Sequence, residues 1–205
     1  MKKILITVSS LLALQAKSQF IKDTVKIGEQ IWSTSILDVS TFRNGDSIFF
    51  AATHGEWIEC DKLKIPAYCY VWDSVELGKH YNWYAVNDYR GLAPAGWRIP
   101  SKNDAKYLFK YFEETINPKH SLLEKFPMKY LGYYSVYNGN YSYYTSVLSI
   151  FNPENLAIYY WLSSSHEDES YSDYSYVIGS FKFDDEINLR WTEKGTGNCV
   201  LLLRE

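Results

Sequence analysis

Apolar and polar residues alternate in several short runs along the chain, and this pattern predicts β-strands. Residues 25–32 alternate around a glycine, which predicts a two-stranded hairpin with a tight turn. Asn44-Gly45-Asp46 predicts a second turn, with one residue at positive φ. Residues 81–86 carry an aromatic side chain on each face and therefore predict a strand buried on both sides. Further strands are expected at residues 66–70, 159–165, 188–191 and 199–204.

One segment has helical periodicity instead. Ser101 and Asp104 have the spacing of a capping box, in which each side chain bonds the backbone N–H of the other residue. The apolar residues that follow recur at helical spacing: Ala105, Leu108, Phe109, Phe112 and Ile116. Asn117-Pro118 is expected to end this helix. The pattern as a whole predicts an α+β fold, with small mixed or antiparallel sheets, one main helix and long loops.

The first residues have the composition of an export signal. Lys2 and Lys3 precede an apolar stretch at residues 4–16, and Ala16-Lys17-Ser18 fits a small-x-small cleavage site. The apolar stretch is too short to predict a stable transmembrane span, which needs about 20 residues. We therefore expect a signal peptide at residues 1–18, a single domain at residues 19–205, and a location in the periplasm, at the cell surface or outside the cell.

Charge and composition narrow the class of partner. The formal net charge is -3 and the pI is near 5.8, with scattered Lys and Arg, so nucleic acid is not an expected partner. Aromatic residues make up 18% of the chain and include 19 Tyr. Rings of this half-polar kind suit recognition of carbohydrate or protein as well as an ordinary core.

No catalytic constellation is evident. The four histidines, His54, His80, His120 and His166, are isolated from one another and are expected in solvated loops. Ser163-Ser164-Ser165 lacks the glycines that flank a nucleophile elbow. The sequence therefore predicts a protein that is not an enzyme and that needs no cofactor.

Calcium is the one metal that the sequence leaves open. Acidic residues gather at Glu167, Asp168, Glu169 and Asp173, and again at residues 184–186, and carboxylate oxygens are the ligands that calcium prefers. Their spacing is not that of an EF-hand, so a solvated acidic loop is the favoured interpretation. Glu167, Asp168 and Asp173 are the weak metal candidates.

Two neighbouring motifs resemble a known family. Residues 81–88 read YNWYAVND and residues 91–100 read GLAPAGWRIP, and together they resemble the core of the Fibrobacter succinogenes major paralogous domain. The resemblance is dense over residues 25–48 and 66–101 and thin over residues 115–157. It implies an exported bacterial module with no established chemistry. The element order is also similar to the C-type-lectin-like fold, which includes the formylglycine-generating enzymes; this is an analogy of fold and implies little about function.

Cys60, Cys69 and Cys199 are an odd number for an exported protein. One disulfide and one thiol is the simplest arrangement, and Cys60 with Cys69 is the preferred pair because it closes a short loop. A chain with so few cysteines could also keep all three reduced.

The candidate ligand-binding residues fall in two segments. Residues 130–144 interleave Tyr with Ser, Asn and Gly, as recognition loops do, and Tyr137, Tyr141 and Tyr143 are the candidates there. Trp83, Asn87 and Asp88 are the candidates in the family motif, although Trp83 is expected in the core, together with Trp32, Trp97 and Trp161. We expect non-catalytic binding of an extracellular ligand such as a glycan. The alternative is a structural or adhesion protein that recognises other surface proteins, and an enzyme on a formylglycine-enzyme-like scaffold is disfavoured.

Overall fold

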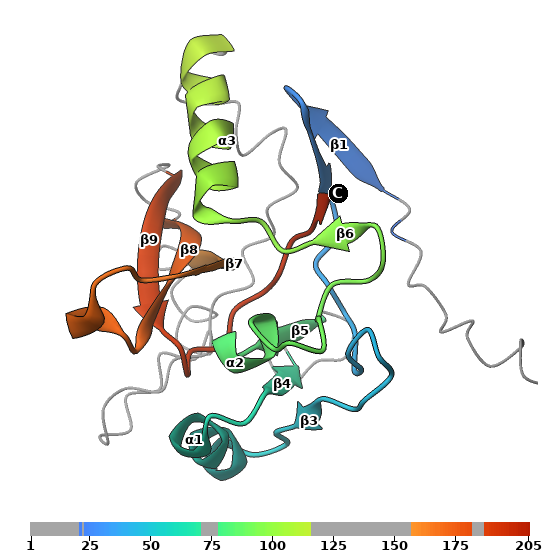
Figure 1. Ribbon diagram of the computed structural model, residues 1–205, viewed down its shortest axis with the longest axis vertical. Helices are drawn as coiled ribbons and strands as arrows, with labels where there is room; N and C mark the ends of the chain where they lie inside the picture. The colour runs from blue at the N-terminus through green and yellow to red at the C-terminus, as the bar shows by residue number, and fades with distance from the viewer. Residues whose placement is uncertain (1–20, 22, 71–77, 116–156, 182–186) are drawn as a thin grey trace, which may run out of the picture.

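The computed structural model describes residues 21, 23–70, 78–115, 157–181 and 187–205, with the side chains of residues 157, 158, 180 and 181 left aside. Within these ranges the chain forms three small sheets and several helices, an α+β fold as predicted (Figure 1). The candidate signal peptide and the Tyr-rich run at 130–144 lie outside the described residues.

The first sheet joins the two ends of the domain. Its strands are β1 (Thr24–Ile27), β2 (Gln30–Ser33), β10 (Leu203–Arg204) and β6 (Trp97–Arg98), all antiparallel and in that order. The predicted β1–β2 hairpin is confirmed. Gly28 in its turn has φ +57, and a side chain there would meet the Tyr107 hydroxyl at 2.6 Å. The turn therefore requires glycine both for its backbone conformation and for space.

A helix that the sequence pattern did not predict connects two strands of the second sheet. β3 (Phe49–Phe50) and β4 (Ala67–Tyr70) pair in parallel, and α1 (His54–Leu63) makes the crossover between them. Thr53 and Glu56 form a capping box at the start of α1. Only Trp57 and Cys60 of this helix are buried, so its sequence has no apolar stripe from which a helix could be predicted.

The predicted strand at residues 81–86 is wrong. β5 (Lys79–Tyr81) ends where the prediction began, and α2 (Trp83–Val86) is a single helical turn. Asn82 is the cause, because its buried side-chain oxygen accepts hydrogen bonds from the N–H groups of Ala85 and Ala67, both at 3.0 Å. Its amide group also donates to the carbonyl of Ile65 at 2.8 Å. A short apolar–polar alternation cannot be told from a capped helical turn by periodicity alone.

The third sheet carries the main helix on one face. β7 (Ala157–Ser165), β8 (Tyr174–Phe181) and β9 (Ile187–Glu193) are antiparallel in that order. α3 (Lys102–Thr115) stands beside them in Figure 1, and its buried residues Ala105, Leu108 and Phe112 pack in one core cluster with residues of β7 and β8. The helix that begins after Ser101 is thus confirmed.

The C-terminal segment runs between two cores. Residues 199–203 are all buried, and they alternate: Cys199, Leu201 and Leu203 face the cluster beneath α3, whereas Val200 and Leu202 face a second cluster that includes Tyr81 and Trp161. An extended segment buried on both faces needs a continuous apolar run, which is what this sequence supplies. Trp32, Trp83 and Trp161 are buried as predicted, and Trp97 is half-buried against the second cluster.

Candidate functional site

Five aromatic rings gather at one end of the third sheet, and we call them the aromatic platform: His166, Tyr171, Tyr174, Tyr176 and Trp191. Tyr174 and Tyr176 are two residues apart on β8 and share one face, and Trp191 lies opposite Tyr176 in the strand register. Tyr171 comes from η5 (Glu169–Tyr171), a short turn that follows β7. The Asp168 side chain caps this turn by accepting the Ser170 N–H at 2.8 Å.

The rings of the platform contact one another directly. His166 lies 5.4 Å from Tyr176, nearly parallel at 17°, and meets Trp191 edge-on at 5.1 Å. Tyr171 is 5.0 Å from His166 and 6.0 Å from Trp191, with its plane inclined by 31° to the Trp191 plane. Trp191 is 54% exposed and Tyr171 is 44% exposed. Packing on the inner side thus fixes two large rings whose outer faces remain open to solvent.

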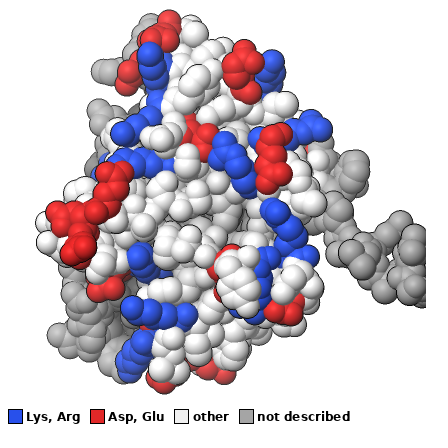
Figure 2. Space-filling view, in the orientation of Figure 1, with Lys and Arg blue, Asp and Glu red and all other residues white. Residues whose placement is uncertain are grey.

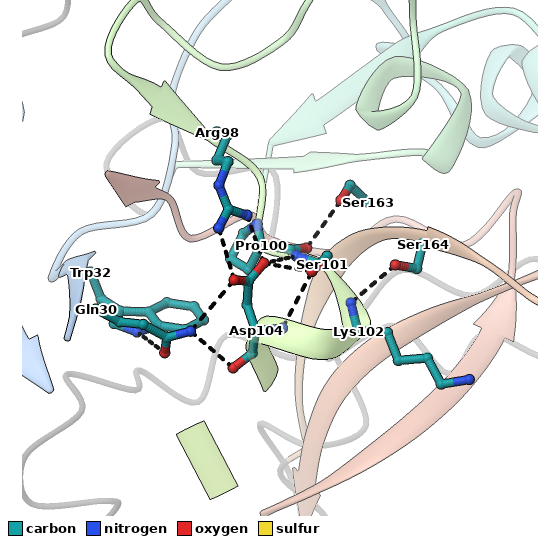
Figure 3. A network of polar contacts seen from close by, with 9 residues as sticks. All are labelled: Gln30, Trp32, Arg98, Pro100, Ser101, Lys102, Asp104, Ser163 and Ser164. Atoms are coloured by element: carbon teal, nitrogen blue, oxygen red, sulfur yellow. Dashed lines mark hydrogen bonds and ion pairs between the residues drawn. The ribbon is translucent and has the colours of Figure 1, made fainter. Parts of the chain in front are cut away.

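A polar network surrounds the start of α3, next to the platform (Figure 3). Both Asp104 oxygens accept hydrogen bonds from the Arg98 guanidinium, at 2.6 and 2.8 Å. The Ser101 N–H and hydroxyl also donate to Asp104, and the Asp104 N–H donates back to Ser101, so the predicted capping box is present. Gln30 of β2 donates to the Asp104 carbonyl. Asp104 therefore joins α3 and β6 through its carboxylate, and the N-terminal hairpin mainly through its backbone carbonyl.

Lys102 connects this network to the platform. Its backbone N–H donates to the Ser164 hydroxyl of β7 at 3.0 Å, and its side chain extends away from the Arg98–Asp104 pair in Figure 3. The ammonium donates to the Tyr176 hydroxyl and to Glu167, each at 2.9 Å. The first residue of the main helix thereby holds one edge of the platform and neutralises one carboxylate beside it.

The Asp104 network makes a prediction about acid stability. Burial raises the pKa of Asp104, but hydrogen bonds from Arg98 and Ser101 outweigh it and lower the pKa to about 2. Because the folded pKa is depressed, the stabilisation is present above the ordinary pKa of 3.8 and is lost as the pH falls toward 2. Asp104→Asn should cost about 2 kcal/mol at neutral pH, since it breaks charge-assisted bonds and a cap.

Urea unfolding measured from neutral pH down to about pH 2 tests this assignment. The wild-type protein should lose stability more steeply than Asp104→Asn below about pH 4, so that the two curves converge. Parallel curves across this range would show that Asp104 is not the group that titrates.

A group of carboxylates adjoins the platform on the other side. Glu193 lies opposite Tyr174 in the strand register and is hydrogen-bonded to it, and Tyr84 donates to Asp61 at 3.3 Å. Burial raises the pKa of both Asp61 and Glu193, and the charge of Asp173 raises both further. Asp61, Asp173 and Glu193 therefore place like charges beside the platform, and Lys64 and Lys194 offset part of them.

The three candidate metal ligands do not share a partner. Glu167 pairs with Lys102, Asp168 caps η5, and Asp173 is exposed on the turn that leads into β8. Within the described ranges, no group of three or more His, Cys, Asp or Glu side chains is arranged to hold a metal ion. The acidic residues at 184–186 lie outside those ranges. Calcium binding at this turn stays a prediction.

Comparison with known protein families shows which family the chain belongs to. The model of the Fibrobacter succinogenes major domain matches residues 25–196, which is most of the sequence. The chain belongs to this family. The match contains the second and third sheets and every residue of the aromatic platform, and it ends before β10 of the first sheet. No curated protein and no solved structure matches the chain, so the similarity to the C-type-lectin-like fold stays a prediction. None of the described helices has the length and apolar character needed to cross a membrane.

The three candidate residues of the family motif lie in the core or in the turn that follows α2. Trp83 is buried in the second core cluster, with the Lys194 ammonium 4.4 Å from its ring centre. Asp88 accepts hydrogen bonds from the Arg90 guanidinium at 2.8 and 2.9 Å, which lower the pKa of Asp88. Asn87 ends α2 and is exposed. These three residues are not part of the platform, and their role in ligand binding stays a prediction.

The cysteines and His80 differ from their predicted environments. The Cys60–Cys69 disulfide is wrong: Cys60, Cys69 and Cys199 carry no disulfide and are all buried. Cys60 and Cys69 pack as small apolar groups beside Trp57. His80 was expected in a solvated loop but is buried in β5. Tyr137, Tyr141 and Tyr143 lie outside the described residues.

The sequence analysis missed the platform because its rings come from separate places in the chain. The signal was nonetheless present at residues 171–176, which read YSDYSY and have the same Tyr-and-Ser composition as the run at 130–144. Trp191 lies between Arg190 and Thr192, so its polar neighbours were compatible with an exposed ring. What the sequence could not supply is the register that places Trp191 beside Tyr176.

Proposed function

We propose that this protein is an exported module that binds polysaccharide by stacking sugar rings on the aromatic platform. The observation that carries the proposal is the exposure of Trp191 and Tyr171, 54% and 44%, on a rigid aromatic base. Large rings are normally buried, and a cluster of exposed ones marks a binding surface. Such rings lose little conformational entropy when a ligand lies on them.

The surroundings of the platform suit a ligand with many hydroxyl groups. Carboxylates, the Tyr hydroxyls and the Lys102 ammonium lie at its edges, so apolar ring faces and hydrogen-bonding groups alternate over a small area. A sugar has the same two characters, with apolar C–H faces and polar edges. The Lys102 ammonium is engaged by Glu167 and the Tyr176 hydroxyl, which supports a binding role for this edge of the platform rather than a catalytic one.

Recognition of a surface protein is the second candidate, and it rests on a different surface. Phe49 and Phe50 of β3 are 46% and 42% exposed, and β3 ends the second sheet. A sheet edge that presents apolar rings is a site where another protein can dock. Export is part of the proposal in both cases and rests on residues 1–18.

A retention screen tests the proposal. Residues 19–205 would be applied to insoluble polysaccharides and run in gels containing soluble ones, with calcium and with a chelator. We expect retention on at least one polysaccharide, unchanged by the chelator, because Glu167 and Asp168 are engaged within the protein. Lack of retention on every polysaccharide would contradict the proposal and favour protein recognition.

A further inference from the structure

The charges around the aromatic platform determine which polysaccharide it suits. We infer that the platform selects polysaccharides that carry protonated amines, such as a deacetylated amino-sugar polymer, over neutral and acidic ones. This inference rests on the proposed function and adds the class of ligand to it.

Exposed carboxylates surround the turn that supplies Tyr171. They are Glu167, Asp168, Glu169 and Asp173, which we call the acidic rim, and all four are exposed. Figure 2 shows acidic side chains gathered at the left of the molecule, where the turn between β7 and β8 lies in Figure 1. The rim is therefore continuous with the platform in the chain and in space.

Lys102, Lys106 and Lys194 lie near the rim and offset part of its charge. Among the described side chains, its ion pairing is limited to Glu167 with Lys102. Lys194 lies nearby, where its ammonium donates to the Ser172 carbonyl and rests over the Trp83 ring, and its charge interacts with that of Asp173 without an ion pair between them. The negative charge of Asp173, one of the rim carboxylates, also helps to raise the pKa of Glu193 and of Asp61. An acidic polysaccharide would be repelled here, whereas an amine would restore neutrality.

The spacing of the rings shows where such an amine would lie. His166, Tyr171 and Trp191 are 5.0 to 6.0 Å apart between ring centres and contact one another. No room remains among them for an ammonium group, so the platform is not a cage of the kind that encloses a cation. The sugar ring would stack on the outer faces of Trp191 and Tyr171, and its amine would reach the rim beside them. The ligand must therefore offer both an apolar ring face and a positive charge.

Isothermal titration with two oligosaccharides of equal length tests the inference. One is a glucosamine oligomer and the other its N-acetylated form, compared at low salt and about pH 6, where surface carboxylates are ionised. We expect the amine form to bind about tenfold more tightly, since each exposed ammonium–carboxylate contact raises affinity by roughly two- to fivefold. Raising the salt concentration should reduce the difference.

Two double variants identify the source of the preference. Glu169→Gln with Asp173→Asn removes two rim charges, and it should bring the two affinities close together, chiefly by weakening binding of the amine form. Glu113→Gln with Glu114→Gln removes two exposed charges from α3, away from the rim, and should keep the preference.

The outcomes separate this inference from the proposed function. Equal affinity of the wild-type protein for both oligomers would overturn the inference and leave polysaccharide binding standing. An equal loss of preference in both double variants would also overturn it, because net charge rather than the rim would then be responsible. Failure to bind either oligomer or any polysaccharide in the retention screen would overturn the proposed function itself.

Discussion

Trp161→Ala should lower the free energy of unfolding by about 5 kcal/mol, enough to unfold many domains of this size. Trp161 is fully buried at the junction of β7, β5 and the C-terminal segment. Its indole N–H donates to the Tyr81 carbonyl at 2.7 Å, and its backbone N–H donates to the Cys199 carbonyl at 3.0 Å. The substitution removes a large apolar volume and also one of the two donors to the Tyr81 carbonyl, the other being the Asn198 N–H.

Two further variants separate packing from hydrogen bonding at this position. Trp161→Phe keeps most of the apolar volume and should cost roughly half as much as alanine. Tyr89→Ala removes a ring that is 95% exposed and should stay within about 0.5 kcal/mol of the wild type. Urea unfolding followed by circular dichroism measures all three. A Trp161→Ala protein with the wild-type midpoint would show that the two cores do not depend on this ring.

Replacing Trp191 and Tyr171 together by alanine should weaken polysaccharide binding by at least about a hundredfold, because a central aromatic contact is typically worth about 2 kcal/mol or more. Both rings have large open faces, so the cost to stability is expected to be much smaller than that of Trp161→Ala. The affinity would be measured by isothermal titration with a soluble form of whichever polysaccharide the retention screen identifies.

A matched control removes two exposed rings elsewhere. Phe49→Ala with Phe50→Ala takes away rings of similar exposure from β3, in the second sheet, and should leave polysaccharide affinity unchanged. If both double variants lose binding equally, or if neither does, the ligand does not lie on the aromatic platform.

Local signals made part of this fold predictable. The β1–β2 hairpin depends on a glycine turn between two alternating runs, and α3 depends on a capping box followed by an apolar stripe, so neighbouring residues specify both elements. The predicted turn at Asn44-Gly45-Asp46 is likewise present, with Gly45 at φ +94. Each of these elements is defined by contacts a few residues apart.

The rest depends on contacts between distant parts of the chain. Asn82 turns the expected strand into α2 because its side chain meets Ala67 and Ile65, some fifteen residues earlier. α1 has a clear cap but only two buried residues, so its helical character owes little to a periodic apolar face. The aromatic platform needs the pairing of β8 with β9 and the turn η5 at once. No local pattern encodes such a meeting of three segments.

A polysaccharide stacked on Trp191 would change the surroundings of its indole N–H, so the indole N–H resonances of the protein report where the ligand lies. The Trp191 resonance can be assigned as the one that disappears in Trp191→Phe, and it would be followed during titration with the polysaccharide that the screen identifies. We expect this resonance to shift while those of the fully buried Trp32 and Trp161 stay in place. Binding that leaves the Trp191 resonance unmoved would contradict stacking of the ligand on Trp191.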